Sequence, residues 1–459
     1  MTTTDAHERD SPPSTPREAP EEAGEEAADV VPLSRNRNYN ILWTGQFFSA
    51  LVLEVASVAF PLLILWHSGS PLEMGIAASL MAAAHMVAVV PAGVVADRYD
   101  RRLTMLICQG LRTLALGGLA VALAMDAYSF TLVLVVVVVE GILGSMFDPA
   151  ETAAMPQVVP KSQMPTAVAR NMARPYIAML LGPAAAGLLF AINPVHPFLA
   201  NTLMIAVSFL ALFWLRLPRR GAPAPGEPEG GPDGPADGTG DEGIGTDRGQ
   251  PAEGRTGMLQ EALTGLRWIT GNRILSVTML WIMASNLFFS ALIIIILATA
   301  HQDGIGAGET GLMMTCLGIG GVCGALIAAR LHAALPASVI ILGFSWTAAA
   351  TTGAMALVPS GIALGVLLGA AALLAPVANT TLMTYQLMVT PDELRGRLSG
   401  IVSFCSGGAG ALGPLIGALF MMLPWGDASG VLACAACLVV VAVFTTLSPT
   451  LRKFPSIPR

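Results

Sequence analysis

The sequence predicts an all-α integral membrane protein in which twelve transmembrane helices form two six-helix bundles. The first observation is composition: 54% of the 459 residues are hydrophobic and only 12% are charged, whereas soluble proteins average about 25% charged residues. The second is that the apolar residues gather into runs of about 20 residues, the length that spans a bilayer. The third is an internal repeat that divides these runs into two sets of six. A soluble enzyme is therefore excluded.

Each apolar run is long enough to cross a hydrocarbon core of about 30 Å at a rise of about 1.5 Å per residue. In the first half the runs cover residues 41–66, 74–96, 103–125, 130–152, 166–191 and 198–217. In the second half they cover residues 274–300, 311–331, 339–358, 361–385, 398–423 and 431–447. Internal proline and glycine are compatible with membrane helices, because neighbouring helices satisfy the freed backbone groups.

Two acidic segments lie outside the predicted helices. Residues 1–34 contain nine acids and two arginines, and residues 218–257 contain eight acids and four arginines. Both have the composition of disordered chain, and the second that of a flexible linker. The formal net charge of the whole chain is −7. The two segments together carry −11, so the rest of the chain carries +4. The predicted order is an acidic tail (1–34), a bundle (35–217), the linker (218–257), an amphipathic interfacial helix (258–273), a second bundle (274–447) and a tail (448–459).

Lysine and arginine predict the orientation in the membrane. The loops near residues 67–73, 126–129, 192–197, 301–310, 359–360 and 424–430 contain neither. The alternate loops and the flanking segments carry Arg35, Arg37, Arg98, Arg101, Arg102, Lys161, Arg216, Arg267, Arg273, Arg330, Arg395, Arg397, Arg452 and Lys453. Short loops rich in these residues stay in the cytoplasm. We therefore expect a multi-pass protein of the cytoplasmic membrane with both termini and the linker inside the cell.

A shift of 231 residues relates the two halves. It places Pro160 on Pro391, Gly182-Pro183 on Gly413-Pro414, Gly93 on Gly324 and Gly75 on Gly306. Two six-helix halves joined by a linker are typical of transporters built from parallel repeats. Such proteins bind their substrate near the midplane between the halves and alternate access by rocking.

The loop after the second run carries a specific motif. It reads Gly93-Val-Val-Ala-Asp97-Arg98-Tyr99-Asp100-Arg101-Arg102. This resembles the signature loop G-x-x-x-D-R-x-G-R-R of the major facilitator superfamily, with Asp100 where the general pattern has glycine. Gly182, Pro183 and Gly187 resemble the antiporter motif of drug:proton antiporters in that superfamily. Residues 265–273 and 391–397 resemble the branch with macrolide-efflux proteins and the enterobactin exporter, and the whole resemblance covers about residues 35–447.

The resemblance implies a major facilitator fold and proton-coupled export of small amphipathic compounds, such as a drug, antibiotic, siderophore or other natural product. We expect the partners to be a small-molecule substrate, protons and the bilayer, with no nucleic acid, and the protein to be a monomer. No cofactor is expected besides the proton gradient as energy source. Proton-coupled uptake of a small metabolite remains open within the same architecture. A non-transporting membrane receptor or scaffold is the alternative of another class.

Charged side chains on the expected cytoplasmic side are candidates for a gating latch between the halves. Asp97 can accept hydrogen bonds from arginines or cap a helix N-terminus, and Arg395 and Arg397 are its expected contacts in the other half. The candidate latch consists of Gly93, Asp97, Arg98, Arg101, Arg102, Arg395 and Arg397. The alternative is that these charges only enforce topology. For Gly182, Pro183 and Gly187, close packing of helices is the alternative to gating.

Two acids lie near the middle of predicted spans, where an ionisable group is costly and marks a proton, ion or substrate site. They are Glu54 in the first run and Glu140 in the fourth. Because the resemblance implies that these two helices line the central cavity, we expect the acids to carry protons or to hold a cationic amine. The structural alternatives are a hydrogen bond from Glu54 to a neighbouring helix and a pair between Glu140 and Arg112.

The other polar residues of the spans have more modest expected roles. Arg112 lies at a similar depth to Asp148 and Glu151, which predicts a structural ion pair, in the first place with Asp148. Arg170 and Arg174 are expected to snorkel to the cytoplasmic surface. The second half has no acid within its runs, so its cavity polarity is expected from Asn286, Ser290, Asn379 and Thr384.

Two kinds of site are not supported by the sequence. Cys434-x-x-Cys437 has no second pair of ligands nearby, so no metal site or disulfide framework is expected. A P-loop motif is missing from the sequence, which excludes an ATP-driven pump of that type.

Overall fold

The computed structural model describes residues 32–215, 266–424, 428–452 and 454. Most of the acidic tail, the whole linker and residues 258–265 of the expected interfacial helix lie outside these described residues. Within the described residues the secondary structure is entirely helical, with no strand. The all-helical fold class is confirmed.

The first half consists of six helices in sequence and two short 3-10 turns. They are α2 (Arg37–Ser68), α3 (Pro71–Arg98), α4 (Arg101–Ala124), α5 (Phe130–Ala154), η1 (Met155–Gln157), η2 (Lys161–Gln163), α6 (Met164–Ile192) and α7 (His196–Leu212). The second half contains the helices α9 (Arg273–Gln302), α10 (Ala307–Ala334), α11 (Ala337–Met355), α12 (Ile362–Leu373), α13 (Ala375–Val389), α14 (Asp392–Met421), α15 (Ser429–Leu447) and α16 (Pro449–Arg452).

Eleven helical spans among the described residues are long and apolar enough to cross a membrane, and α7, with 17 residues, is a shorter apolar helix. The span Ile362–Val389 comprises α12 and α13, which are separated at Leu374. Pro376 follows this break, and its missing N–H and its ring disfavour a continuous helix through this point. The single helix expected for residues 361–385 is therefore two helices in one span.

The helix starts follow from capping residues in the sequence. The side chains of Asn36, Ser70, Asp100, Ser129 and Asn272 each accept a hydrogen bond from a backbone N–H in the first turn of the following helix. Such caps satisfy donors that have no partner within the helix. Capping also explains why an aspartate stands at position 100, where the signature loop has glycine. Asp100 Oδ1 accepts a hydrogen bond from the Leu103 N–H at 2.8 Å.

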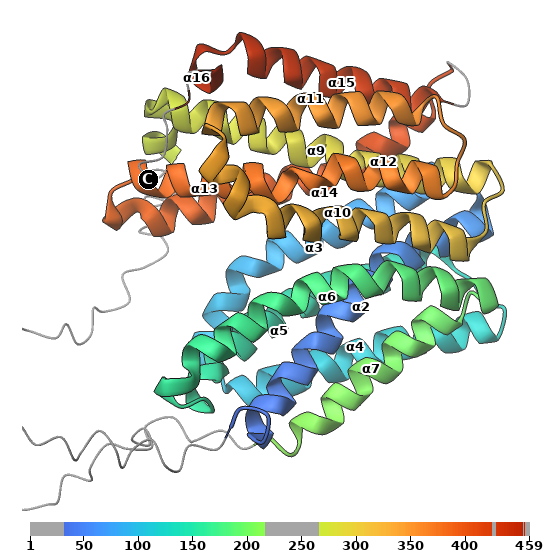
Figure 1. Ribbon diagram of the computed structural model, residues 1–459. Helices are drawn as coiled ribbons and strands as arrows, with labels where there is room; N and C mark the ends of the chain where they lie inside the picture. The colour runs from blue at the N-terminus through green and yellow to red at the C-terminus, as the bar shows by residue number, and fades with distance from the viewer. Residues whose placement is uncertain (1–31, 216–265, 425–427, 453, 455–459) are drawn as a thin grey trace, which may run out of the picture.

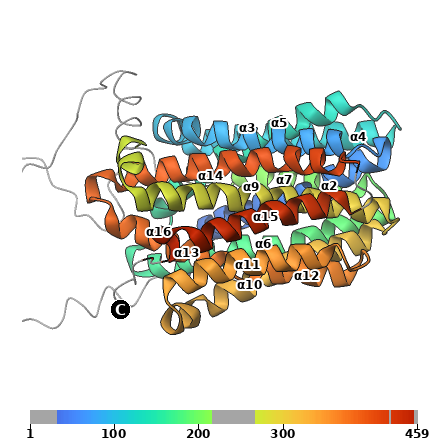
Figure 2. The same ribbon diagram turned by 90° about the horizontal axis from the view of Figure 1, so that it is seen from above.

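The two halves form separate bundles that lie side by side, and in Figure 1 the helices of the first half are inclined to those of the second (Figures 1 and 2). The start of α2 and helix α16 lie at the same end of the molecule, toward the left of Figure 1. We call this end the terminal end and the other the opposite end. Helices α3 and α6 of the first half pack against α14 and α10 of the second half, respectively.

The tightest contacts between the halves lie toward the opposite end. A methyl group at Gly187 of α6 would lie 2.5 Å from the Ala307 carbonyl oxygen and 2.6 Å from Gly311 Cα on α10. On the other side of the interface, Ser79 Oγ of α3 accepts a hydrogen bond from the Leu415 N–H of α14 at 3.0 Å. Toward the terminal end, in contrast, a methyl group at Gly93, Gly396 or Gly400 would meet no described atom within 4 Å. The halves are therefore closed against each other at the opposite end.

The internal repeat is visible in these contacts, with a corrected register. Gly182 of α6 packs against Glu54 of α2, and Gly413 of α14 packs in the same way against Ser290 of α9, which keeps the shift of 231 for α6 and α14 but relates α2 to α9 by a shift of 236. A methyl group at Gly75 would contact the carbonyl oxygen of Pro414 at 2.7 Å, and one at Gly311 would contact that of Pro183 at 2.6 Å. The structure thus equates Gly75 with Gly311, and the alignment of Gly75 with Gly306 is wrong.

Candidate functional site

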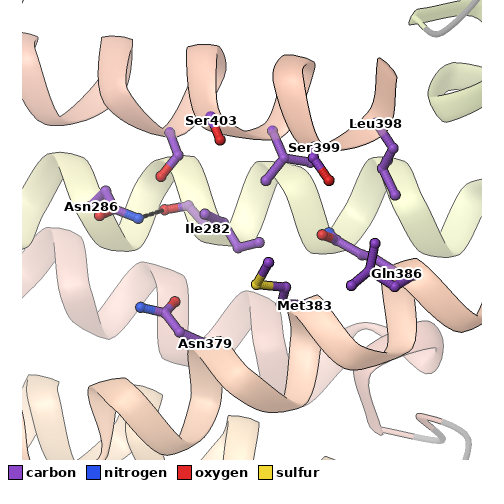
Figure 3. A pocket seen from close by; sticks show the side chains of 11 residues that line it. Ile282, Asn286, Asn379, Met383, Gln386, Leu398, Ser399 and Ser403 are labelled. Atoms are coloured by element: carbon purple, nitrogen blue, oxygen red, sulfur yellow. Dashed lines mark hydrogen bonds between the residues drawn. The ribbon is translucent and has the colours of Figure 1, made fainter. Parts of the chain in front are cut away.

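A cavity of about 280 Å³ lies between α9, α13 and α14 in the second half (Figure 3). Its lining combines amides and hydroxyls with apolar side chains, and none of the described lining residues is ionisable. The lining consists of Ile282, Asn286, Asn379, Met383, Gln386, Leu387, Leu398, Ser399, Val402, Ser403 and Ser406. The cavity can therefore take an uncharged group that both forms hydrogen bonds and packs against apolar surface.

The polar groups of this cavity are partly fixed by neighbouring residues. Asn286 Nδ2 donates to the Ile282 carbonyl oxygen at 2.9 Å, and Gln386 Nε2 donates to Thr278 Oγ1 at 3.2 Å. These bonds hold the two amides in place and leave their carbonyl oxygens as acceptors. In Figure 3, Asn379 extends from α13 toward α9, and Met383 lies between the two helices.

Two of the four cavity residues expected from the sequence line this cavity, namely Asn286 and Asn379. Ser290 lies one turn farther along α9, where its Cβ would be 2.7 Å from a methyl group at Gly413, so it packs against α14. Thr384 is half-buried on α13 and is not part of the lining.

Gln386 and a stripe of serines on α14 also line the cavity and were not predicted. Ser399, Ser403 and Ser406 follow one another at spacings of four and three residues, which places them on one face of a helix. This spacing was visible in the sequence and could have identified them.

Glu140 lies in the interior of the first bundle, where it pairs with Arg112. The Glu140 Oε2 atom accepts from Arg112 Nε at 3.1 Å and from Nη2 at 2.9 Å, and only 1% of Arg112 and 3% of Glu140 is exposed. Arg112 Nη1 donates to Ser49 Oγ at 2.8 Å, and Gln109 Nε2 donates to Ser208 Oγ at 3.1 Å beside it. Glu140 therefore forms the structural pair with Arg112 that was the alternative to a proton or substrate site.

The expected ion pair between Arg112 and Asp148 is wrong. Asp148 Oδ1 instead accepts a hydrogen bond from Gln46 Nε2 of α2 at 2.6 Å. Asp148 lies two turns nearer the terminal end of α5 than Glu140, so the Arg112 guanidinium meets Glu140 first.

The expectation for Arg174 is also wrong, whereas Arg170 is exposed. Arg174 is only 7% exposed, and its Nη1 atom lies 3.6 Å from Glu151 Oε1 on α5. The arginine therefore points into the first bundle toward a buried acid and does not snorkel. Glu151 was expected only to lie at a similar membrane depth to Arg112, and its pairing with Arg174 was not predicted.

Glu54 lies at the closest contact between α2 and α6. Gly182 packs directly against its Cβ and backbone, so a larger residue at 182 would displace α6. Glu54 is half-buried, and among the described residues no hydrogen bond to its carboxylate is found. Of the two central acids, Glu54 is thus the one whose carboxylate is not held by a described partner.

Three of the expected latch residues, Arg101, Arg102 and Arg395, form bonds within their own halves. Arg101 Nη1 donates to the Ala153 carbonyl oxygen at 2.6 Å, at the end of α5, and Arg102 Nη2 donates to that of Phe213 at 2.6 Å. In the second half, Arg395 Nε donates to the Leu387 carbonyl oxygen at 3.0 Å, and its Nη1 lies 2.5 Å from Asp392 Oδ1.

The Arg395 side chain is therefore held by groups of its own half. The side chain of Asp97 lies outside the described residues, so its part in the latch is not placed. Gly93 has open space at its Cα, and Arg98 is exposed at the end of α3. Arg397 lies on the first turns of α14.

The residues of the expected antiporter motif serve helix contacts in this conformation. Gly182 faces α2, whereas the Pro183 carbonyl oxygen and Gly187 face α10 across the interface between the halves. The same short segment of α6 thus contacts both its own bundle and the other one. No group of three or more His, Cys, Asp or Glu residues able to hold a metal ion is present in the described part of the chain.

Comparisons with known proteins agree with this architecture. The family described as Major Facilitator Superfamily matches residues 42–300, which is more than half of the chain. The multidrug efflux pump Tap of Mycolicibacterium fortuitum is 25% identical over 417 residues, covering 87% of this chain and 92% of Tap. The enterobactin exporter EntS of Shigella boydii is 24% identical over 432 residues, covering 92% of this chain and 94% of EntS.

Solved structures share the fold at low identity. The nucleoside transporter NupG has a TM-score of 0.64 at 12% identity, covering 91% of this chain and 99% of NupG. A D-xylose-proton symporter has a TM-score of 0.60 at 12% identity, covering 93% of this chain and 99% of the symporter. On the family match, the chain belongs to the Major Facilitator Superfamily and is a multi-pass membrane transporter.

Proposed function

We propose that this transporter exports small amphipathic compounds in exchange for protons, and that it lies in the cytoplasmic membrane with both termini inside the cell. The observation that carries the proposal is the cavity between α9, α13 and α14. Its amides and serine hydroxyls lie beside Met383, Leu387 and Leu398, which suits a compound with both polar and apolar parts.

The direction of transport is inferred from the relatives. Both Tap and EntS are named for efflux, and each matches nearly the whole chain. With the termini inside, the terminal end faces the cytoplasm. The contacts at Gly187 and Ser79 then close the outer side, and the cavity is in the conformation that loads cargo from the cytoplasm.

Glu54 is the proposed coupling acid at mid-depth. This carboxylate lies within a membrane span and has no described partner. It can exchange a proton when water reaches it. Because Gly182 packs on Glu54, a movement of α6 between the two access states would change the environment of this carboxylate directly.

The proposal is tested in inverted membrane vesicles that hold an acidic lumen. A panel of neutral, cationic and anionic amphipathic compounds, with enterobactin among them, is added and the lumenal pH is followed. An antiporter loads the compound into the vesicle and releases protons, so the lumen becomes more alkaline. Movement of compound and proton in the same direction would establish proton-coupled uptake instead. If accumulation of every compound is independent of the protein, the receptor or scaffold reading replaces transport.

A further inference from the structure

The first half contains two buried arginine–glutamate pairs that differ in how well they are satisfied. Arg112 donates two hydrogen bonds to Glu140 and a third to Ser49. In the pair of Arg174 and Glu151, the closest approach is 3.6 Å, which is too long for a hydrogen bond. Glu151 Oε2, Arg174 Nε and Arg174 Nη1 are buried without a hydrogen-bond partner among the described residues, whereas in the other pair Glu140 Oε1 alone is in that position.

This difference has an energetic consequence. A buried ion pair is maintained when its geometry is good and hydrogen bonds satisfy its remaining donors and acceptors. The pair of Arg112 and Glu140 approaches that condition, whereas the pair of Arg174 and Glu151 does not. The ionised form of Glu151 is therefore less completely compensated by hydrogen bonds than that of Glu140.

Asp148 connects this pair to water. It lies one turn before Glu151 on α5, and it interacts electrostatically with Glu151. Asp148 is exposed, with one carboxylate oxygen held by Gln46 Nε2 at 2.6 Å. Because an exposed carboxylate is costly against lipid, such residues face the bundle interior or an aqueous space. Asp148 thus offers a proton a path from water to Glu151.

Among the described residues, further charged and titratable groups near Glu151 come from neighbouring helices. Tyr39 of α2, whose buried hydroxyl is unpartnered among the described residues, interacts electrostatically with Glu151, Arg174 and Arg170. Arg101 of α4 donates to the carbonyl oxygen of Ala153, two residues beyond Glu151. His85 of α3 packs at Gly141, about 15 Å along α5 from Glu151 at 1.5 Å per residue.

We propose that Glu151 is a second proton-binding site of the transport cycle, with Asp148 as its contact to water and Arg174 as its counter-charge. This inference rests on the proposed proton coupling. A proton taken up from the outer side in the other access state neutralises Glu151 Oε2, and in the conformation described it leaves by way of Asp148 to water at the terminal end. While Glu151 is protonated, Arg174 has no charged partner on Glu151. Loss of the proton restores the pair between α5 and α6, so protonation controls the contact between these two helices.

The first experiment needs no transported compound. The infrared carboxyl band of the full-length protein in lipid nanodiscs is recorded from pH 4 to pH 9. We expect a titrating band that Glu151→Gln abolishes and Asp126→Asn leaves unchanged, since Asp126 is an exposed acid at the opposite end. Asp148→Asn is expected to move the midpoint by about one pH unit or more, as a neighbouring charge does. An unchanged band in Glu151→Gln overturns the inference.

If Glu151→Gln does not fold, Glu151→Asp and Arg174→Lys replace it. Each keeps the charges but changes the distance between them, so the midpoint is expected to move. An unmoved midpoint in both variants also overturns the inference.

The second experiment ties the site to transport. With a compound that moves in the vesicle assay, we expect Glu151→Gln to lose gradient-driven transport about tenfold or more, while exchange of labelled for unlabelled compound without a gradient stays within about twofold of wild type. Equal loss of both activities indicates a purely structural pair and rejects the inference. If the wild type itself moves no compound, the proposed function fails, whereas the infrared titration still decides whether Glu151 binds a proton.

Discussion

Arg112 Nη2 lies 2.9 Å from Glu140 Oε2 in the interior of the first bundle, and both side chains are almost completely buried. Removing one partner leaves an unpaired charge in a low dielectric. We therefore expect Arg112→Gln or Glu140→Gln to lower the free energy of unfolding by about 3–5 kcal/mol. Denaturant or thermal unfolding of the purified protein measures this loss.

The matched control for the ion pair is the double variant Arg112→Met with Glu140→Leu, which removes both charges at once. It is expected to lose much less stability than either single variant, because no unpaired charge remains. Single variants as stable as wild type would show that the pair is not a structural element.

Glu54→Gln tests the acid at mid-depth. We expect gradient-driven export to fall by about tenfold or more, because the coupling between proton and cargo is lost, while the protein remains folded and inserted. Export in inverted vesicles is compared with exchange in the absence of a gradient, and Asp126→Asn is the control. Wild-type export in Glu54→Gln would remove this residue from the mechanism.

Gly187→Val tests the closed contact at the opposite end. Its Cβ would lie 2.5 Å from the Ala307 carbonyl oxygen, so we expect the halves to be forced apart there and transport to be abolished. Spin labels on α6 and α10 would report a longer distance between these helices at the opposite end. Gly118→Val is the control, since Gly118 lies within α4 with no described atom within 4 Å of its added Cβ. Equal effects of the two substitutions would refute the steric explanation.

Asn379→Ala and Ser403→Ala test the cavity of the second half. Each removes one hydrogen-bonding group from the lining, and a hydrogen bond contributes about 1 kcal/mol. We expect KM for the transported compound to rise about fivefold in each variant, with kcat within about twofold of wild type. Initial transport rates measure both constants. Thr384→Ala, a change on α13 outside the lining, should have no effect, and a KM shift as large as that of Asn379→Ala would place the binding site elsewhere.

The positions of the helices could be predicted because local chemistry determines them. Side chains such as Asn36, Ser70 and Ser129 cap helices at the boundaries that the apolar runs indicated. The break at Leu374 was not predicted, although Pro376 was visible, because membrane helices often tolerate proline when neighbouring helices compensate.

The polar site was only partly predictable. Asn286 and Asn379 could be recognised as polar groups within apolar runs, but the sequence does not say which face of α9 or α13 meets α14. Ser290 and Thr384 are on these same helices and differ only in the direction in which they point, which is decided by packing. The serine stripe of α14 was detectable by its spacing and was overlooked.

The sequence by itself determined that this chain is a helical membrane protein with rare, conspicuous charges, because composition and run length reflect the cost of polar groups in lipid. Only the tertiary structure decided which charges meet. At 1.5 Å per residue, Arg112 lies about 17 Å from the terminal end of α4, whereas Glu140 and Asp148 lie about 21 Å and 9 Å from that end of α5. A long arginine side chain can span either difference in depth, so its partner depends on how α4 and α5 are rotated and shifted against each other. Because of that packing, Arg112 pairs with Glu140, Asp148 is exposed, and Arg174 points inward toward Glu151.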